Sequence, residues 1–241
     1  MTKSWHELSW DPNAPSVVAW QQGQLDHTMQ TPVAHRLPYL RSIVRHKRVL
    51  DIGVVEHGVA NEGGDAWLHR HLAQEAETIL GVDILADAVA ALAAKGWNVR
   101  THDVCAGPIE GEMFDVIVMG EVIEHLGAPS AMLDNLAPML APGGRVVITT
   151  PNPYMLHRVA KYLRGSFPDS VDHAMLLSPP NMAELGRRSG LELDAWRGVS
   201  LKRLGGARNH AMHLMRKALV GGTKNPLLNC DTVIYEFVHH T

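Results

Sequence analysis

Short hydrophobic runs alternate along the chain with segments in which hydrophobic residues recur every three or four positions. The runs are typical of buried strands, and they cover residues 48–52, 78–83, 99–103, 114–119 and 145–150. The periodic segments predict helices over residues 33–46, 66–77, 85–95 and 129–140. Strands that alternate with helices form βαβ units, so the pattern predicts a parallel sheet with helices on both faces.

The remaining residues extend this pattern at both ends. Residues 150 onward predict helices over 154–163, 180–189 and 209–220 and two final strands over 191–199 and 232–239. Residues 1–32 are polar, with three tryptophans among Pro, Asn and Gln, and we interpret them as an irregular arm or lid with short helical turns. No further domain boundary is visible. The prediction is a single Rossmann-like α/β domain over residues 33–241 with a mostly parallel, seven-stranded sheet.

The composition is that of an ordinary globular protein, since 46% of the 241 residues are hydrophobic and 20% are charged. No apolar run approaches the roughly 20 residues that span a bilayer, and the first residues lack the apolar core of a signal peptide. Two cysteines cannot build a disulfide framework or a four-cysteine zinc site. We therefore expect a reduced, cytoplasmic compartment and no membrane partner.

Charge is unevenly distributed along the chain. The net charge of -3 argues against a dedicated nucleic-acid binder. Residues 195–230, however, form a basic insertion before the last strand and contain no acidic residue. Its basic residues are Arg197, Lys202, Arg203, Arg208, Arg216, Lys217 and Lys224. Two interpretations stay open, a solvated surface segment and a lobe that faces an anionic ligand.

Acidic residues stand at the ends of several predicted strands. They are Asp51, Asp83, Asp103 and Glu121. Ligands of open parallel sheets bind at the carboxyl ends of the strands, where an acid after the second strand can accept hydrogen bonds from a ribose diol. The phosphate-loop and dinucleotide glycine motifs are absent, as are the nucleophile elbow of hydrolases and the HExxH pair.

These motifs resemble those of the class I S-adenosylmethionine-dependent methyltransferases, over residues 48–199. The first motif is VLDIG at residues 49–53, and GVDI at 81–84 carries the ribose acid. The run FDVIVMGEVIEHL at 114–126 is similar to the ubiquinone-biosynthesis type, and LAPGGR at 140–145 matches the family's turn. The resemblance implies S-adenosyl-L-methionine as cofactor. Its binding residues would be Asp51, Gly53, Asp83, Ile84, Asp103, Val104 and Glu121.

One position departs from the family's pattern. The family has a second glycine two residues after the first, where Val55 stands here. A side chain at Val55 forces the backbone near the methionyl end of the cofactor onto a different path. A domain that binds the cofactor without turning it over therefore remains an alternative.

Glu121, Glu124 and His125 are spaced so that they share one face of a helical turn. In one interpretation, Glu124 stabilises the first turn of a helix and His125 packs against the cofactor. In the other, they bind Mg²⁺ or Mn²⁺. The spacing resembles that of metal-dependent O-methyltransferases, in which a later histidine completes the site, and His173 matches it. Without an ion, His125 or His173 would act as the general base.

The expected reaction is displacement of the sulfonium methyl group by a substrate nucleophile, aided mainly by alignment of the two. The resemblance favours an oxygen acceptor, and the basic segment favours a small anionic metabolite. Two alternatives stay open, an RNA 2′-O-methyltransferase and a non-catalytic partner subunit that binds the cofactor. Neither the acceptor nor the oligomeric state follows from the sequence.

Overall fold

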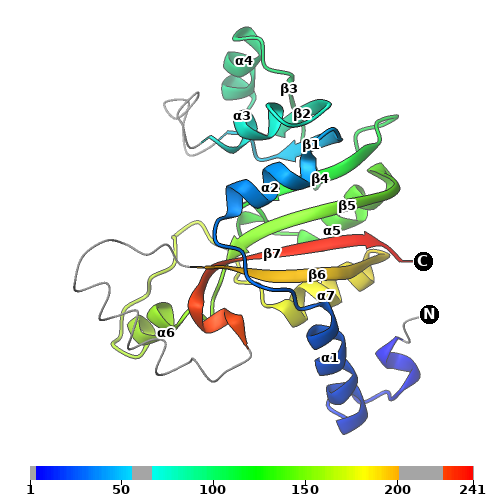
Figure 1. Ribbon diagram of the computed structural model, residues 1–241, viewed down its shortest axis with the longest axis vertical. Helices are drawn as coiled ribbons and strands as arrows, with labels where there is room; N and C mark the ends of the chain where they lie inside the picture. Colours follow the sequence, from blue (N-terminus) through cyan, green and yellow to red (C-terminus); the bar gives the residue numbers. More distant parts are fainter. Residues whose placement is uncertain (1–3, 56–66, 201–224, 241) are drawn as a thin grey trace.

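A seven-stranded sheet forms the centre of the computed structural model, which describes residues 4–55, 67–200 and 225–240 (Figure 1). The strand order is β3-β2-β1-β4-β5-β7-β6, and β7 runs antiparallel to both its neighbours whereas the other paired strands are parallel. The strands are β1 (Arg48–Ile52), β2 (Thr78–Asp83), β3 (Val99–Thr101), β4 (Phe114–Gly120), β5 (Leu140–Pro151), β6 (Leu191–Ser200) and β7 (Cys230–His239). The predicted mostly parallel α/β fold is confirmed.

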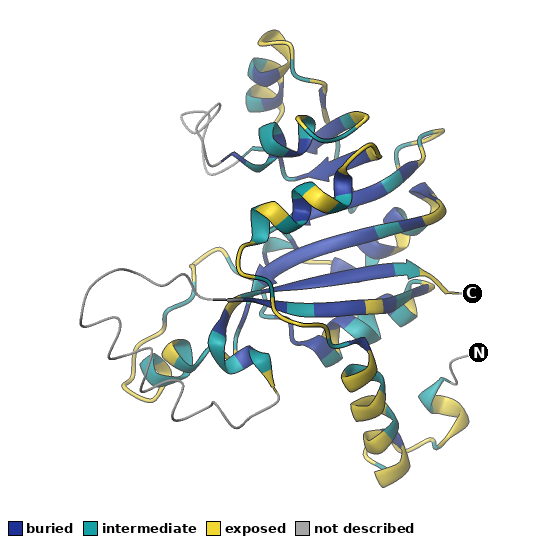
Figure 2. Ribbon diagram, viewed as in Figure 1, coloured by how far each residue is buried: buried dark blue, intermediate teal, exposed yellow. Residues whose placement is uncertain are grey.

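Helices cover both faces of this sheet. They are α1 (Pro15–Thr28), α2 (Arg36–Val44), α3 (Leu68–Ala73), α4 (Ala86–Ala94), α5 (Pro129–Leu136), α6 (Leu156–Tyr162) and α7 (Pro179–Arg188). Alternate residues of β4 point to opposite faces, so Val116 and Val118 join the core under α2 and α3. Ile117 and Met119 join the core under α5 and α7, which lie behind the sheet in Figure 1. The central strands are buried along most of their length (Figure 2).

The junction between α5 and β5 differs from the prediction of one helix over residues 129–140. The α-helix ends at Leu136, and a 3-10 turn over Ala137–Met139 follows it. Pro138 has no backbone N–H to donate to the helix, which explains the change. The expected turn over residues 141–144 lies inside β5, because Leu140 already pairs with Phe114 before a shift in register.

The N-terminal arm is a correction to the expected irregular segment, because α1 is a 14-residue helix. Only Val17 and Thr28 of this helix are buried, and most of α1 is exposed in Figure 2. The indole Nε1 of Trp196 donates to the carbonyl of Leu25 at 2.9 Å, and Met29 pairs with Trp196 beyond the edge of β6. A sparse apolar pattern of this kind gives little periodicity from which to predict a helix.

The position of α1 also corrects the expectation of a lid. A cavity of about 370 Å³ lies between α1, α7 and the first residues of β6. Since β6 runs in the same direction as β5, its first residues lie at the end of the sheet opposite the carboxyl ends of the parallel strands. The described part of the arm therefore does not cover the carboxyl ends, where the candidate site lies.

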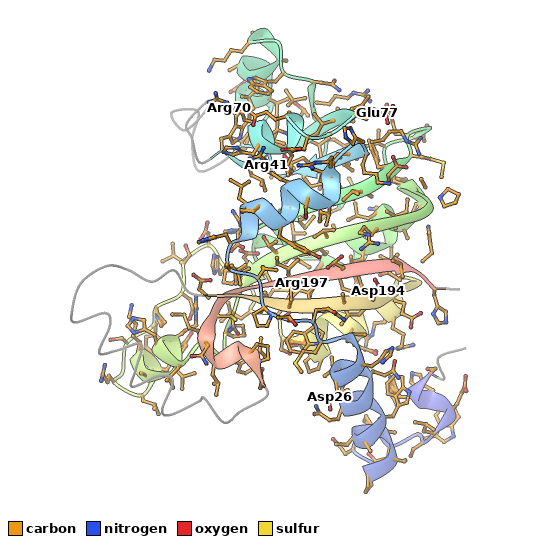
Figure 3. The ribbon with its side chains drawn as sticks, viewed as in Figure 1. Asp26, Arg41, Arg70, Glu77, Asp194 and Arg197 are labelled. Atoms are coloured by element: carbon orange, nitrogen blue, oxygen red, sulfur yellow. The ribbon has the colours of Figure 1, made fainter. Side chains whose placement is uncertain are left out.

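The predicted helix over residues 209–220 and most of the basic insertion lie outside the described residues. Of its basic side chains, Arg197 is described and is labelled in Figure 3. It donates a hydrogen bond to Glu236 in β7 at 2.9 Å. None of the described helices is both long and apolar enough to cross a membrane.

A buried carboxylate joins α2 to three strands. Glu236 is 1% exposed and accepts hydrogen bonds from Tyr39 in α2, from Arg145 in β5 at 2.8 Å and from Arg197 in β6. Burial and the Glu236 carboxylate raise the pKa of the Tyr39 hydroxyl. Two guanidinium groups thus compensate one buried charge. The same carboxylate, through Tyr39, holds α2 on the sheet.

Replacing Glu236 with alanine is expected to lower the free energy of unfolding by about 3 kcal/mol, because two arginines lose the partner of a buried ion pair. Denaturant unfolding measures this change. The matched control is Glu112→Ala, which breaks an exposed pair with Arg100 and should cost under about 1 kcal/mol. Equal losses of unfolding free energy in the two variants would show that the buried ion pairs of Glu236 stabilise the fold no more than an exposed pair does.

Candidate functional site

The carboxyl ends of β1, β2, β4 and β5 bring several of the predicted residues to one edge of the sheet. Asp83, at the end of β2, is buried, and both its carboxylate oxygens are used. Oδ2 accepts from the backbone N–H of Val55 at 2.9 Å, and Oδ1 accepts from that of Leu85 at 3.1 Å. Each carboxylate oxygen has room for a second donor, so Asp83 also suits a ribose hydroxyl.

The turn after β1 is built around Gly53. Its φ of 81° lies in the left-handed region, and a Cβ atom there would come within 2.3 Å of Val122 Cγ2. Asp51 stands two residues earlier and is buried, with its Oδ2 2.9 Å from His69 Nδ1. The N–H of Val55 is bound by Asp83, and Val55 is not among the described non-glycine residues with a positive φ, so the backbone does not require glycine at this position. The missing second glycine therefore coexists with an ordered link between β1 and β2.

The ends of β2 and β3 supply three more of the predicted cofactor-binding residues. Ile84 is 67% exposed and offers an apolar surface. Asp103 is exposed and accepts from the backbone N–H of Cys105 at 2.8 Å. Val104 is buried in the core, and its carbonyl accepts from Asn135 at 2.9 Å. Of these three residues, Val104 therefore presents little side chain to a ligand.

Glu121 follows β4 directly and is one of two described non-glycine residues with a positive φ, which is 58°. Its Oε1 binds Arg36 Nη1 at 3.0 Å and accepts from the Thr149 hydroxyl at 3.0 Å. Arg36 is the first residue of α2, and we did not predict it from the sequence. It belongs to no motif, and only the fold brings it to the end of β4.

A second group of side chains follows Glu121. Glu124 and His125 lie on a 3-10 turn over Ile123–His125, and His173 comes from the loop before α7. Backbone N–H groups of Ala174 and Met175 donate to the carbonyl of Glu124 at 2.8 and 3.2 Å, which brings His173 into place. One ligand atom from each of Glu124, His125 and His173 lies within 4.8 Å of the other two.

Glu121 is not a member of this group. The turn begins after Glu121, and the left-handed backbone at Glu121 directs its carboxylate to Arg36 instead. The expected helical face shared by Glu121, Glu124 and His125 therefore does not form. The arrangement offers one carboxylate and two imidazoles.

The electrostatics of this group are unusual. Glu124 is 1% exposed, and its Oε2 accepts from the Thr150 hydroxyl at 3.0 Å whereas its Oε1 has no partner. The Nδ1 atom of His173 is also buried without a partner. Burial, and then the charge of Glu121, raises the pKa of Glu124 to about 7. Burial and the neighbouring His125 lower the pKa of His173. Buried polar atoms without partners call for a ligand, an ion or a proton.

A family profile described as a methyltransferase domain matches residues 25–195. The chain belongs to the class I S-adenosylmethionine-dependent methyltransferases. Proteins named ubiquinone biosynthesis O-methyltransferase are similar to it. The one from Aeromonas salmonicida is 28% identical over 64% of this chain and 66% of its own length. The one from Pseudomonas entomophila is 29% identical over 61% and 65%. The chain thus spans just under two thirds of the length of these relatives.

Solved methyltransferase structures share the fold. A Haloferax volcanii methyltransferase in complex with the Trm112 activator has a TM-score of 0.59 at 15% identity, and the match covers 92% of this chain and 95% of that one. The magnesium protoporphyrin IX methyltransferase of Synechocystis, with bound SAH, has a TM-score of 0.54 at 18% identity, with 98% and 93% covered. At these identities the likeness supports the fold alone.

Proposed function

We propose that this methyltransferase domain transfers the methyl group of S-adenosylmethionine to a hydroxyl oxygen of a small acceptor. The observation that carries the proposal is the group of the buried Glu124 with the partly exposed His125 and His173, which the turn after β4 and the loop before α7 bring together. The names of the similar proteins support an oxygen acceptor, since they are O-methyltransferases.

The cofactor would lie along the ends of β1, β2 and β3. Asp83 would accept hydrogen bonds from the ribose, and Ile84 with Asp103 would flank the adenine. Gly53 and Asp51 would lie near the methionyl end. This assignment follows the order of the strands, because neighbouring strand ends contact neighbouring parts of an extended ligand.

The protein residues have two tasks in the reaction, alignment and proton removal. The sulfonium is already an activated donor, so holding acceptor oxygen and methyl group in line supplies much of the rate. The acceptor must lose its hydroxyl proton as the new O–CH₃ bond forms and the S–CH₃ bond breaks. His125 and His173 would be the candidate bases, since their imidazoles lie beside Glu124.

We further propose that Glu124, His125 and His173 bind a divalent cation. A cation would satisfy the unpartnered Oε1 of Glu124 and Nδ1 of His173 together. Two imidazoles and one carboxylate suit Mn²⁺ better than Mg²⁺, which favours an all-oxygen site. Bound there, the cation would lower the pKa of an acceptor hydroxyl. The direct test is methyl transfer to a panel of phenols and carboxylated phenols, before and after treatment with EDTA and re-addition of Mn²⁺. No transfer to any acceptor would overturn the proposed activity.

Mn²⁺ affinity is expected to fall about tenfold between pH 8 and pH 6. The pKa of Glu124 is about 7, so this carboxyl is mostly ionised at pH 8 and mostly protonated at pH 6, where a proton competes with the cation. Calorimetry of EDTA-treated protein at the two pH values measures the change. The same affinity at both would mean that Glu124 is not a ligand.

A further inference from the structure

A buried acid–imidazole pair lies beneath the turn that follows β1. The side chains of Asp51 and His69 are 3% and 1% exposed, and Asp51 Oδ2 lies 2.9 Å from His69 Nδ1. His69 is the second residue of α3, so the pair joins the end of β1 to that helix. The Nε2 atom of His69 is buried without a partner, and Nδ1 is thus the only polar edge of the ring in use.

The surroundings of His69 leave its ring little freedom. Gly81 in β2 is the strand partner of Asp51 in β1. A Cβ atom on Gly81 would come within 2.8 Å of His69 Cε1. The imidazole therefore occupies space that a larger residue at position 81 would fill. The rings of Trp67 and Trp97 pack against it, with centroids 5.3 and 5.7 Å away.

The same cluster also holds the next part of the turn. Trp67, which is 2% exposed, donates its Nε1–H to the carbonyl of Val54 at 2.9 Å. The N–H of Val55 is bound by Asp83. Side chains of His69, Trp67 and Asp83 thus add to the hydrogen bonds that the N–H groups of Gly53 and Val54 donate to the carbonyl of Val82 at 2.9 and 3.4 Å.

We propose that His69 is a positioning residue for cofactor binding. Its Nδ1–H donates to the Asp51 carboxylate and so fixes the end of β1, from which the turn at Gly53 begins. This turn leads to Val55, which stands where the family has its second glycine. A buried carboxylate without this donor would be uncompensated and would seek another partner, which displaces the turn. The proposal rests on the proposed cofactor site at the ends of β1 and β2.

A matched pair of variants tests this role. The amide nitrogen of asparagine stands where Nδ1 stands in histidine, whereas that of glutamine stands nearer to Nε2. His69→Asn keeps the donor to Asp51 and His69→Gln misplaces it, while both remove the ring. With S-adenosylhomocysteine as the probe in calorimetry, we expect the dissociation constant to rise at least tenfold in His69→Gln and less than threefold in His69→Asn. The value of kcat at saturating cofactor should be similar in the two variants.

Thermal unfolding of both variants separates this role from a structural one. If His69 only fills space, the two variants lose the same stability and bind the probe equally, and that result overturns the proposal. A wild-type chain that does not bind S-adenosylhomocysteine overturns the cofactor site and this role with it. Wild-type binding with no difference between the variants overturns the role of His69 alone.

Discussion

Replacing Glu124 with glutamine is expected to abolish Mn²⁺ binding and to lower kcat for methyl transfer at least 100-fold. Glutamine preserves the shape of the side chain and its contact with Thr150, but it removes the one negative charge of the proposed ligand set. Without that charge, two imidazoles are left to hold the cation, and the acceptor hydroxyl keeps its ordinary pKa. Calorimetry with Mn²⁺ and single-turnover transfer assays measure the two effects.

Glu121→Gln is the matched control for cation binding. The Glu121 carboxylate is bound by Arg36 and Thr149 and lies outside the group, so its loss should change Mn²⁺ affinity less than threefold. Equal losses in the two variants would restore the ligand set predicted from the sequence, in which Glu121 joins Glu124, His125 and the His173 that the family resemblance adds. Full activity of Glu124→Gln in excess EDTA would instead leave His125 or His173 as a metal-free general base.

The sheet was predictable because its central strands are buried on both faces. Such strands appear as unbroken hydrophobic runs, and the run at residues 78–83 matches β2 at both ends. By contrast, α1 buries only Val17 and Thr28, so its sequence contains almost no helical periodicity. Where packing leaves a helix mostly exposed, the pattern of hydrophobic residues does not mark it.

The candidate site likewise contains residues that the sequence predicts and residues that only the fold brings together. Strand-end acids such as Asp83 follow from the topology, because the carboxyl ends of parallel strands meet at one edge. The proximity of Glu124 and His173 joins residues far apart in sequence, and only the family resemblance suggested it. Nothing local predicted that Glu121 would turn toward Arg36, since that outcome depends on a left-handed backbone and on the start of a helix 85 residues away.

His69 was missed for a related reason. A histidine on an amphipathic helix is common and by itself indicates no function. The role of His69 is visible only in the fold, where Asp51 and Gly81 lie against its ring. The altered glycine motif was visible in the sequence, whereas the contacts that accompany it were not. The contacts of Val55 and Val54 in the fold show how a turn that lacks the second glycine is still held.

Replacing Asp83 with alanine is expected to weaken binding of S-adenosylhomocysteine about 10- to 100-fold. The variant loses a charged acceptor for the ribose, worth about 1.5–3 kcal/mol, and it also frees the N–H groups of Val55 and Leu85. Asp83→Asn separates these losses, because its amide oxygen still accepts from one of the two backbone groups. Calorimetry of both variants measures the effect, with Glu112→Gln as the control, because Glu112 is a carboxylate before β4 that pairs with Arg100 and lies outside the proposed cofactor site.

A 2′-deoxy form of the same ligand decides which loss dominates. If Asp83 binds the ribose, removal of the 2′-hydroxyl weakens binding to the wild-type chain and has little further effect on Asp83→Ala, so the two changes are coupled. Independent effects would mean that Asp83 acts only by holding the Val55 backbone. Unchanged affinity in Asp83→Ala would remove this residue from the cofactor site, and with it the reason for placing the adenosine along the ends of β2 and β3.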